Sequence, residues 1–136
     1  MDEIVVDNSI VMCWCFADQA TERSDAVLAH LRKNKAVVPA VFPLELGNAV
    51  VASERRKKLS RADAQHFLRL IQALPLRVDQ ELPQRQLGDI LALARQYDLS
   101  TYDASYLDLS MRAGLALATE DGSLRGAARR AGVTLF

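Results

Sequence analysis

The chain of 136 residues lacks several features that would place it in a special class of protein. It has no run of about 18 uncharged apolar residues, so we expect no membrane span. Its two cysteines, Cys13 and Cys15, lie too close in sequence to cross-link a fold, and we expect free thiols. It has no Gly-x-Gly-x-x-Gly or Gly-x-x-x-x-Gly-Lys motif, which argues against dinucleotide and triphosphate binding. Its formal net charge is zero, so long-range attraction does not draw it onto nucleic acid.

What remains is the composition of one ordinary globular domain covering residues 1–136. Half of the residues are hydrophobic and a quarter are charged, and this length is enough for a buried core. The N-terminal segment Met-Asp-Glu-Ile-Val-Val-Asp is acidic and leads straight into an apolar run, unlike a secretory signal. We therefore expect a cytoplasmic protein.

Short apolar runs alternate with longer helical patterns, which predicts an α/β fold. Ser9 is the expected cap of the first helix, and Pro83 suits the first turn of a later one. The order predicts a three-layer α/β/α sandwich with a mainly parallel central sheet. The expected strands are 3–7, 36–38, 76–78, 115–119 and 133–136. The expected helices follow Ser9 and cover about 21–32, 41–57, 60–73, 83–97, 101–114 and 123–131.

Four acidic residues occupy positions that such a fold would bring to one edge of the sheet. Asp7 and Asp121 follow apolar runs, at the carboxyl ends of expected strands, where parallel sheets bind ligands. Asp103 falls in the first turn of a helix, where the helix dipole favours a carboxylate. Glu45 lies mid-helix on an apolar face, where no local feature requires a charge.

Each of these residues also has a purely structural interpretation. Asp7 suits a helix cap, Glu45 can extend to water, Asp103 suits a first helical turn, and Asp121 suits an Asp-Gly-Ser turn. Together they indicate more, because clustered carboxylates repel one another unless a hard divalent cation lies among them. The combination predicts a magnesium-dependent enzyme that cleaves phosphodiester bonds, with Glu45 or Asp103 as the proton acceptor.

The remaining acidic residues lack this arrangement. Glu120 should point to the opposite side of the extended chain from Asp121. The others are interpreted as solvated charges or helix caps: Asp18, Asp25, Asp63, Asp79, Asp89, Asp98 and Asp108.

Four segments carry a resemblance to a known family. They are Val6-Asp7-Asn8-Ser9 followed by Trp14, then Pro43 to Ala49, Leu99 to Tyr106, and Leu117 to Asp121. Over essentially its whole length the chain resembles PIN-domain ribonucleases of the VapC type, the toxins of bacterial type II toxin–antitoxin systems.

The resemblance implies a function and a site. The catalytic residues, which would also hold Mg²⁺ or Mn²⁺, would be Asp7, Glu45, Asp103 and Asp121. Hydroxyls of Ser9 and of Thr101 or Thr119 would support these carboxylates without binding the metal directly. The enzyme would be an endoribonuclease that cleaves RNA phosphodiester bonds through a metal-activated water. Its expected partners are the RNA substrate, a cognate VapB-like antitoxin whose tail crosses the acidic groove, and a second copy of the chain in a homodimer.

Two other functions compete with this one. A non-catalytic PIN-like module that binds RNA or a partner would be expected to lack at least one carboxylate, and all four are present. A phosphoryl-transfer enzyme with Asp7 as nucleophile would want an Asp two residues later and a lysine near the last strand. Ser9 stands at the first place, and no lysine follows Lys58.

Outside the acidic positions, few residues suggest a role. Trp14 is interpreted as a core or interface residue rather than an RNA-stacking platform. Two basic groups are candidates for phosphate contact: Arg55 to Lys58 with Arg61, and Arg125 with Arg129 and Arg130. His30 and His66 are interpreted as structural or surface residues.

Overall fold

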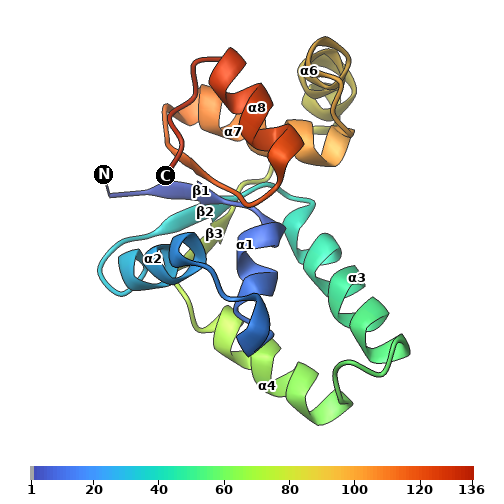
Figure 1. The fold of residues 1–136 in the computed structure, drawn as a ribbon. Helices are drawn as coiled ribbons and strands as arrows, with labels where there is room; N and C mark the ends of the chain where they lie inside the picture. The colour runs from blue at the N-terminus through green and yellow to red at the C-terminus, as the bar shows by residue number, and fades with distance from the viewer. Residues whose placement is uncertain (1) are drawn as a thin grey trace.

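The computed structural model describes residues 2–136, which form one parallel sheet covered by helices on both faces (Figure 1). The strands are β1 (Ile4–Val6), β2 (Ala36–Val38), β3 (Leu76–Val78) and β4 (Leu117–Ala118), in the order β3-β2-β1-β4. All three pairings are parallel. The carboxyl ends of the strands therefore meet at one edge of the sheet, as the sequence predicts.

The helices complete a three-layer α/β/α arrangement. In the view of Figure 1, α7 and α8 lie above the sheet and α1, α2 and α4 lie below it. The helices below and beside the sheet are α1 (Asn8–Cys13), α2 (Glu22–His30), α3 (Phe42–Arg55) and α4 (Arg61–Gln72), with a 3-10 turn η1 (Ala17–Gln19). The rest are α5 (Pro83–Arg85), η2 (Gln86–Ile90), α6 (Leu91–Tyr97), α7 (Thr101–Ala113) and α8 (Gly122–Arg130).

The apolar core holds in place the edge of the sheet where the carboxyl ends of the strands meet. All residues of β1, β2 and β4 are buried, because helices cover both faces of the sheet. Val27 of α2, Leu46 of α3 and Leu107 of α7 pack into the same apolar cluster. Within residues 2–136, no helix combines the length and the apolar character needed to cross a membrane.

Three sequence predictions about the elements are wrong in detail. The expected fifth strand at 133–136 is only an isolated parallel bridge between Leu117 and Leu135 at the edge of the sheet. The expected helix 83–97 is interrupted by η2, a π turn. Ser9 does not cap the first helix, because the side chain of Asp7 does so and Ser9 lies inside α1.

The structure also corrects the interpretation of Asp108 as a solvated charge or cap. Asp108 is buried on α7 and forms ion pairs with two arginines. Arg85 donates from both Nε and a terminal nitrogen, and Arg112 donates from Nε at 2.8 Å. Arg112 reaches on to Asp79 at 2.9 Å. This network ties the segment after β3 to α7.

Candidate active site

Asp7 stands at the centre of the sheet edge, directly after β1. Its Oδ1 accepts hydrogen bonds from the backbone N–H groups of Ser9, at 3.0 Å, and Ile10, at 3.4 Å. These bonds cap α1. The side chain is 4% exposed, so the carboxylate sits below the surface at the point where β1 becomes α1.

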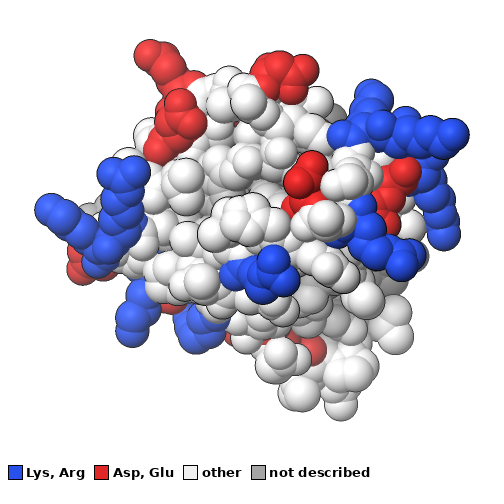
Figure 2. All heavy atoms as spheres, turned by 90° about the horizontal axis from the view of Figure 1, so that it is seen from below, with Lys and Arg blue, Asp and Glu red and all other residues white. Residues whose placement is uncertain are grey.

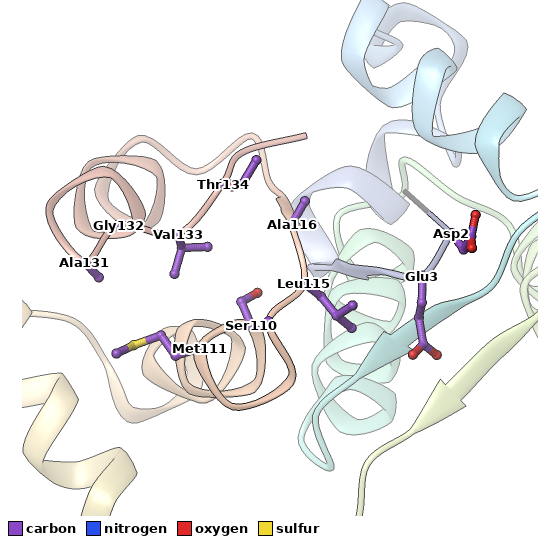
Figure 3. A pocket seen from close by; sticks show the side chains of 11 residues that line it. Asp2, Glu3, Ser110, Met111, Leu115, Ala116, Ala131, Gly132, Val133 and Thr134 are labelled. Atoms are coloured by element: carbon purple, nitrogen blue, oxygen red, sulfur yellow. The ribbon is translucent and has the colours of Figure 1, made fainter.

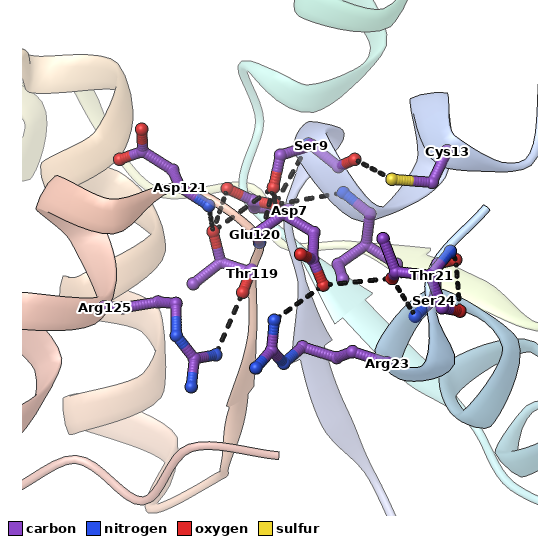
Figure 4. A network of polar contacts seen from close by, with 11 residues as sticks. Asp7, Ser9, Cys13, Thr21, Arg23, Ser24, Thr119, Glu120, Asp121 and Arg125 are labelled. Atoms are coloured by element: carbon purple, nitrogen blue, oxygen red, sulfur yellow. Dashed lines mark hydrogen bonds and ion pairs between the residues drawn. The ribbon is translucent and has the colours of Figure 1, made fainter. Parts of the chain in front are cut away.

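Hydroxyl groups from both neighbouring elements hold this carboxylate (Figure 4). Thr119, which is fully buried after β4, donates to Asp7 Oδ2 at 2.7 Å, and Ser9 donates to Oδ1. Ser9 Oγ in turn accepts the backbone N–H of Glu120 at 2.8 Å. Of the two threonines named from the sequence, Thr119 makes this contact, whereas Thr101 is exposed.

The electrostatics of Asp7 are unusual for an aspartate. Burial raises its pKa from 3.8 to about 6, against the opposing effect of the bonds from Ser9, Thr119 and Ile10. The charge of Asp103 raises it further. Within residues 2–136, Asp7 forms no ion pair with an arginine or a lysine. A buried carboxylate of this kind is costly when ionised and favours a site for a cation.

Glu45 approaches the same edge from the first turn of α3. The hydroxyl of Tyr106, a buried residue of α7, donates to its Oε1 at 2.7 Å. Burial raises the pKa of Glu45, the Tyr106 bond opposes this rise, and the charge of Asp103 adds to it. The residue that sequence analysis places mid-helix without a local reason is therefore held by a specific partner.

Asp103 links the four carboxylates electrostatically. Its charge raises the pKa of both Asp7 and Glu45. Burial raises the pKa of Asp103 itself, and the charge of Asp121 adds to this rise. Asp121 caps α8 by accepting the N–H of Leu124 at 2.9 Å, and its own N–H donates to Thr119 at 3.0 Å. All four predicted side chains thus belong to one end of the sheet.

The four carboxylates share this edge without forming a closed cage. In the described part of the chain, no three His, Cys, Asp or Glu side chains are grouped tightly enough to enclose a metal ion. The donor set still fits Mg²⁺ or Mn²⁺, because every donor is a carboxylate oxygen and Asp7 is buried without a compensating cation. Mg²⁺ binds one or two carboxylates directly and reaches others through its waters, so it does not require a closed cage.

Glu120 takes the other side of the chain, as the sequence predicts. Its Oε1 accepts from Arg23 at 2.7 Å and from the hydroxyl of Thr21 at 3.2 Å (Figure 4). Arg125 donates to the carbonyl oxygen of Thr119 at 3.1 Å. Of the basic residues proposed to guide a substrate backbone, Arg125 is therefore the one that contacts a residue holding Asp7.

On the face shown in Figure 2, lysine and arginine side chains lie in separate groups with uncharged surface between them. The guanidinium of Arg130 lies 5.7 Å from the ring centre of Tyr97. Trp14 donates from Nε1 to the carbonyl oxygen of Ser24 at 2.8 Å and is partly buried against the core, in agreement with its interpretation as a core or interface residue.

A pocket of about 730 Å³ lies at the opposite end of the sheet, before β1 and β4 (Figure 3). Ser110 lines it, and the buried Oγ of Ser110 has no hydrogen-bond partner among the residues that the structure describes. The acidic residues there are Asp2 and Glu3, and Glu3 pairs with Arg77. Its distance from the four carboxylates separates this pocket from the candidate site.

Sequence analysis missed Tyr106 as a functional candidate. It lies three residues after Asp103 on α7, so the two share a helical face. From the sequence alone, that spacing could have indicated a second polar group facing the carboxyl edge of the sheet. Asn8 was also missed, because nothing in the sequence shows that its amide oxygen is buried without a partner.

The fold is shared with several solved structures. One is PAE2754 from Pyrobaculum aerophilum, with 26% identity and a TM-score of 0.71 over 93% of this chain and 86% of that one. A toxin–antitoxin complex from Klebsiella pneumoniae matches with 14% identity and a TM-score of 0.59, over 87% and 86%. FitAcB from Neisseria gonorrhoeae matches with 21% identity and a TM-score of 0.61, over 98% and 96%.

Sequence comparison assigns the family. A search of curated proteins finds no match. The family model described as the PIN domain matches residues 4–130, which include all four carboxylates and every strand of the sheet. Proteins with this domain are generally nucleases, that is, hydrolases. The chain belongs to the PIN domain family.

Proposed function

We propose that the chain is a Mg²⁺- or Mn²⁺-dependent endoribonuclease and the toxin of a type II toxin–antitoxin pair. The observation that carries the proposal is the set of four carboxylates at one sheet edge, where the charge of Asp103 raises the pKa of Asp7 and Glu45 and the charge of Asp121 raises that of Asp103. Membership of the PIN family supports nuclease chemistry. The similar structure described as a toxin–antitoxin complex supports a protein partner.

In this proposal the four carboxylates have different roles. Asp7, Asp103 and Asp121 hold the cation with Glu45, directly or through its waters. When bound, the cation supplies a water of lowered pKa and offsets charge on the scissile phosphate. Glu45 accepts the proton of the attacking water, because Tyr106 fixes Oε1 while Oε2 remains available. Thr119 and Ser9 keep the Asp7 carboxylate in place.

The partner proposal follows from charge. An edge with four carboxylates and no arginine pairs among residues 2–136 suits a cationic segment. An arginine from a VapB-like antitoxin would complement it with up to five donors. A homodimer is also proposed, on the exposed apolar side chains of Leu82 and Leu87.

The test is cleavage of single-stranded RNA by the purified protein in the presence of Mg²⁺ or Mn²⁺. We expect internal cleavage with either metal and none in EDTA. Cleavage that continues in EDTA contradicts the metal assignment. Absence of cleavage with both metals, from a folded protein, contradicts the ribonuclease proposal as a whole.

A further inference from the structure

A second pocket opens directly beside the candidate active site. It has a volume of about 430 Å³ and is lined by Asn8, Leu44, Glu45, Asn48 and Tyr102 among others. This volume falls in the range of about 300–1,000 Å³ typical of small-molecule sites. Glu45 belongs to both sites, and Asn8 and Tyr102 are the chain neighbours of Asp7 and Asp103. A ligand in this pocket therefore lies next to the proposed point of cleavage.

The pocket presents an aromatic face. Tyr102 is 58% exposed in the first turn of α7, and Leu44 is 78% exposed in the first turn of α3. A large exposed aromatic side chain beside a polar cleft suits a flat, partly apolar ligand. Unpaired bases of single-stranded RNA stack on such side chains, and sequence-specific RNA recognition mostly uses bases of this kind.

The pocket also holds an unsatisfied polar group. The Oδ1 of Asn8 is buried and has no hydrogen-bond partner within the described residues. Buried polar atoms are nearly always paired in folded proteins, so an unpaired acceptor on a residue that lines the pocket favours a donor from a ligand. The exposed amide of Asn48 lies on the same pocket wall. An asparagine amide can pair in two hydrogen bonds with the N6 and N7 edge of adenine.

From these three features we infer that the pocket between α1, α3 and the start of α7 is a nucleobase subsite, which selects the base next to the cleaved bond. Tyr102 supplies the stacking face, and Asn8 accepts from an exocyclic amino group, with adenine the best fit. The inference rests on the proposed ribonuclease function and adds to it a determinant of where the RNA is cut.

The first experiment maps the cut sites. A pool of single-stranded RNA with random sequence is cleaved in Mg²⁺, and the new ends are sequenced. The wild-type protein should enrich adenine at one position beside the cut. Asn8→Ala should flatten that enrichment, and Tyr102→Ala should lower kcat/KM about tenfold. Tyr102→Phe keeps the aromatic face and should lose less. Leu70→Ala, an exposed truncation on α4, is the matched control and should change neither quantity.

The second experiment does not depend on catalysis. Fluorescence anisotropy in EDTA measures the affinity of the protein for oligo(A) and oligo(U) RNAs of about 12 nucleotides. This length corresponds to about one to three binding sites for a single strand. Wild-type protein should favour oligo(A), and Asn8→Ala and Tyr102→Ala should each reduce the difference. Equal binding of the two RNAs, or a difference that neither substitution alters, overturns the subsite even where cleavage proceeds normally. Loss of self-association in the Tyr102→Ala variant, with RNA binding intact, would assign the pocket to a protein interface and also overturn it.

Discussion

Asp7 and Asp108 are buried to the same degree, and their surroundings are opposite. Asp7 is 4% exposed and Asp108 is 3% exposed. Two arginines neutralise Asp108, whereas among residues 2–136 Asp7 receives only hydroxyl and backbone N–H donors. Neutral donors offset only part of the cost of burying a charge, so the pKa of Asp7 is raised to about 6. The comparison separates a carboxylate that completes the fold from one whose environment favours an added cation.

The largest contrast should appear in catalysis. Asp7→Asn or Asp103→Asn should lower RNA cleavage by about a thousandfold or more, because losing roughly 4 kcal/mol of charge stabilisation at the cation has that effect. Asp108→Asn should retain the wild-type rate per folded molecule, since Asp108 contacts only arginines of the network. Rates are measured in Mg²⁺ below the melting temperature of every variant. A fully active Asp7→Asn protein would remove Asp7 from the site.

The free energy of unfolding should change in opposite directions in the Asp7→Asn and Asp108→Asn variants. In EDTA at pH 7.5, Asp7→Asn should raise the free energy of unfolding by up to about 3 kcal/mol, since the pKa shift from 3.8 to about 6 costs about 1.4 kcal/mol per unit. Asparagine also caps helices as well as aspartate does. Asp108→Asn should lower it by about 2 kcal/mol, because Arg85 and Arg112 lose their partner but are about 30% and 29% exposed to water. Urea unfolding measures both; two changes of the same sign would refute the comparison.

The pH dependence tests the same difference in the wild-type protein. The pKa of Asp7 is higher in the folded state than the unfolded value of 3.8, so the folded protein binds the extra proton between about pH 4 and 6. Stability from this group is therefore present at low pH and is lost as pH rises through about 6. We expect Asp7→Asn to remove this loss, and Mg²⁺ to offset it above pH 6. Urea midpoints at pH 4.5, 6 and 7.5, with and without Mg²⁺, give the answer. If the urea midpoint changed equally with pH in the wild-type and Asp7→Asn proteins, the result would contradict the raised pKa of Asp7.

The smallest predicted effect concerns Tyr106. Tyr106→Phe keeps the buried ring and removes only the hydroxyl that holds Glu45. A hydrogen bond to a charged group contributes about 1.5 kcal/mol or more, so kcat should fall about tenfold while KM changes little. Melting temperature and Mn²⁺ affinity are measured alongside. A loss that appears only in KM would place Tyr106 in substrate binding instead.

The sequence was sufficient to predict the four strands of the sheet and the edge at which their carboxyl ends meet. Asp7 and Asp121 follow apolar runs that are buried on both faces, and such runs identify parallel strands and their carboxyl ends. The cap role foreseen for Asp7 is confirmed, whereas Asp121, interpreted from the sequence as a turn residue, also caps a helix. At these positions the structural interpretation and the functional one describe the same side chain.

Contacts distant in sequence could not be predicted. Asp108 and Arg85 are 23 residues apart, and neither position carries a local pattern that names the other. Thr119 reaches Asp7 across 112 residues, and only the resemblance suggested a supporting hydroxyl. The fifth strand failed for a different reason: Leu135 lies at the edge of the sheet, where one parallel bridge to Leu117 replaces a ladder.

The π turn η2 determines which way two side chains of one helical segment face. Arg85 and Ile90 are five residues apart, which in an α-helix would turn them about 140° away from each other. A π turn closes with an i→i+5 hydrogen bond and brings them closer to one face of the helix. Arg85 can thus reach Asp108 while Ile90 packs with Ala104, both on α7. The extra residue in this turn lets one segment contact α7 through both an ion pair and an apolar side chain. Deletion of Gly88 would restore α-helical spacing and break one of these two contacts.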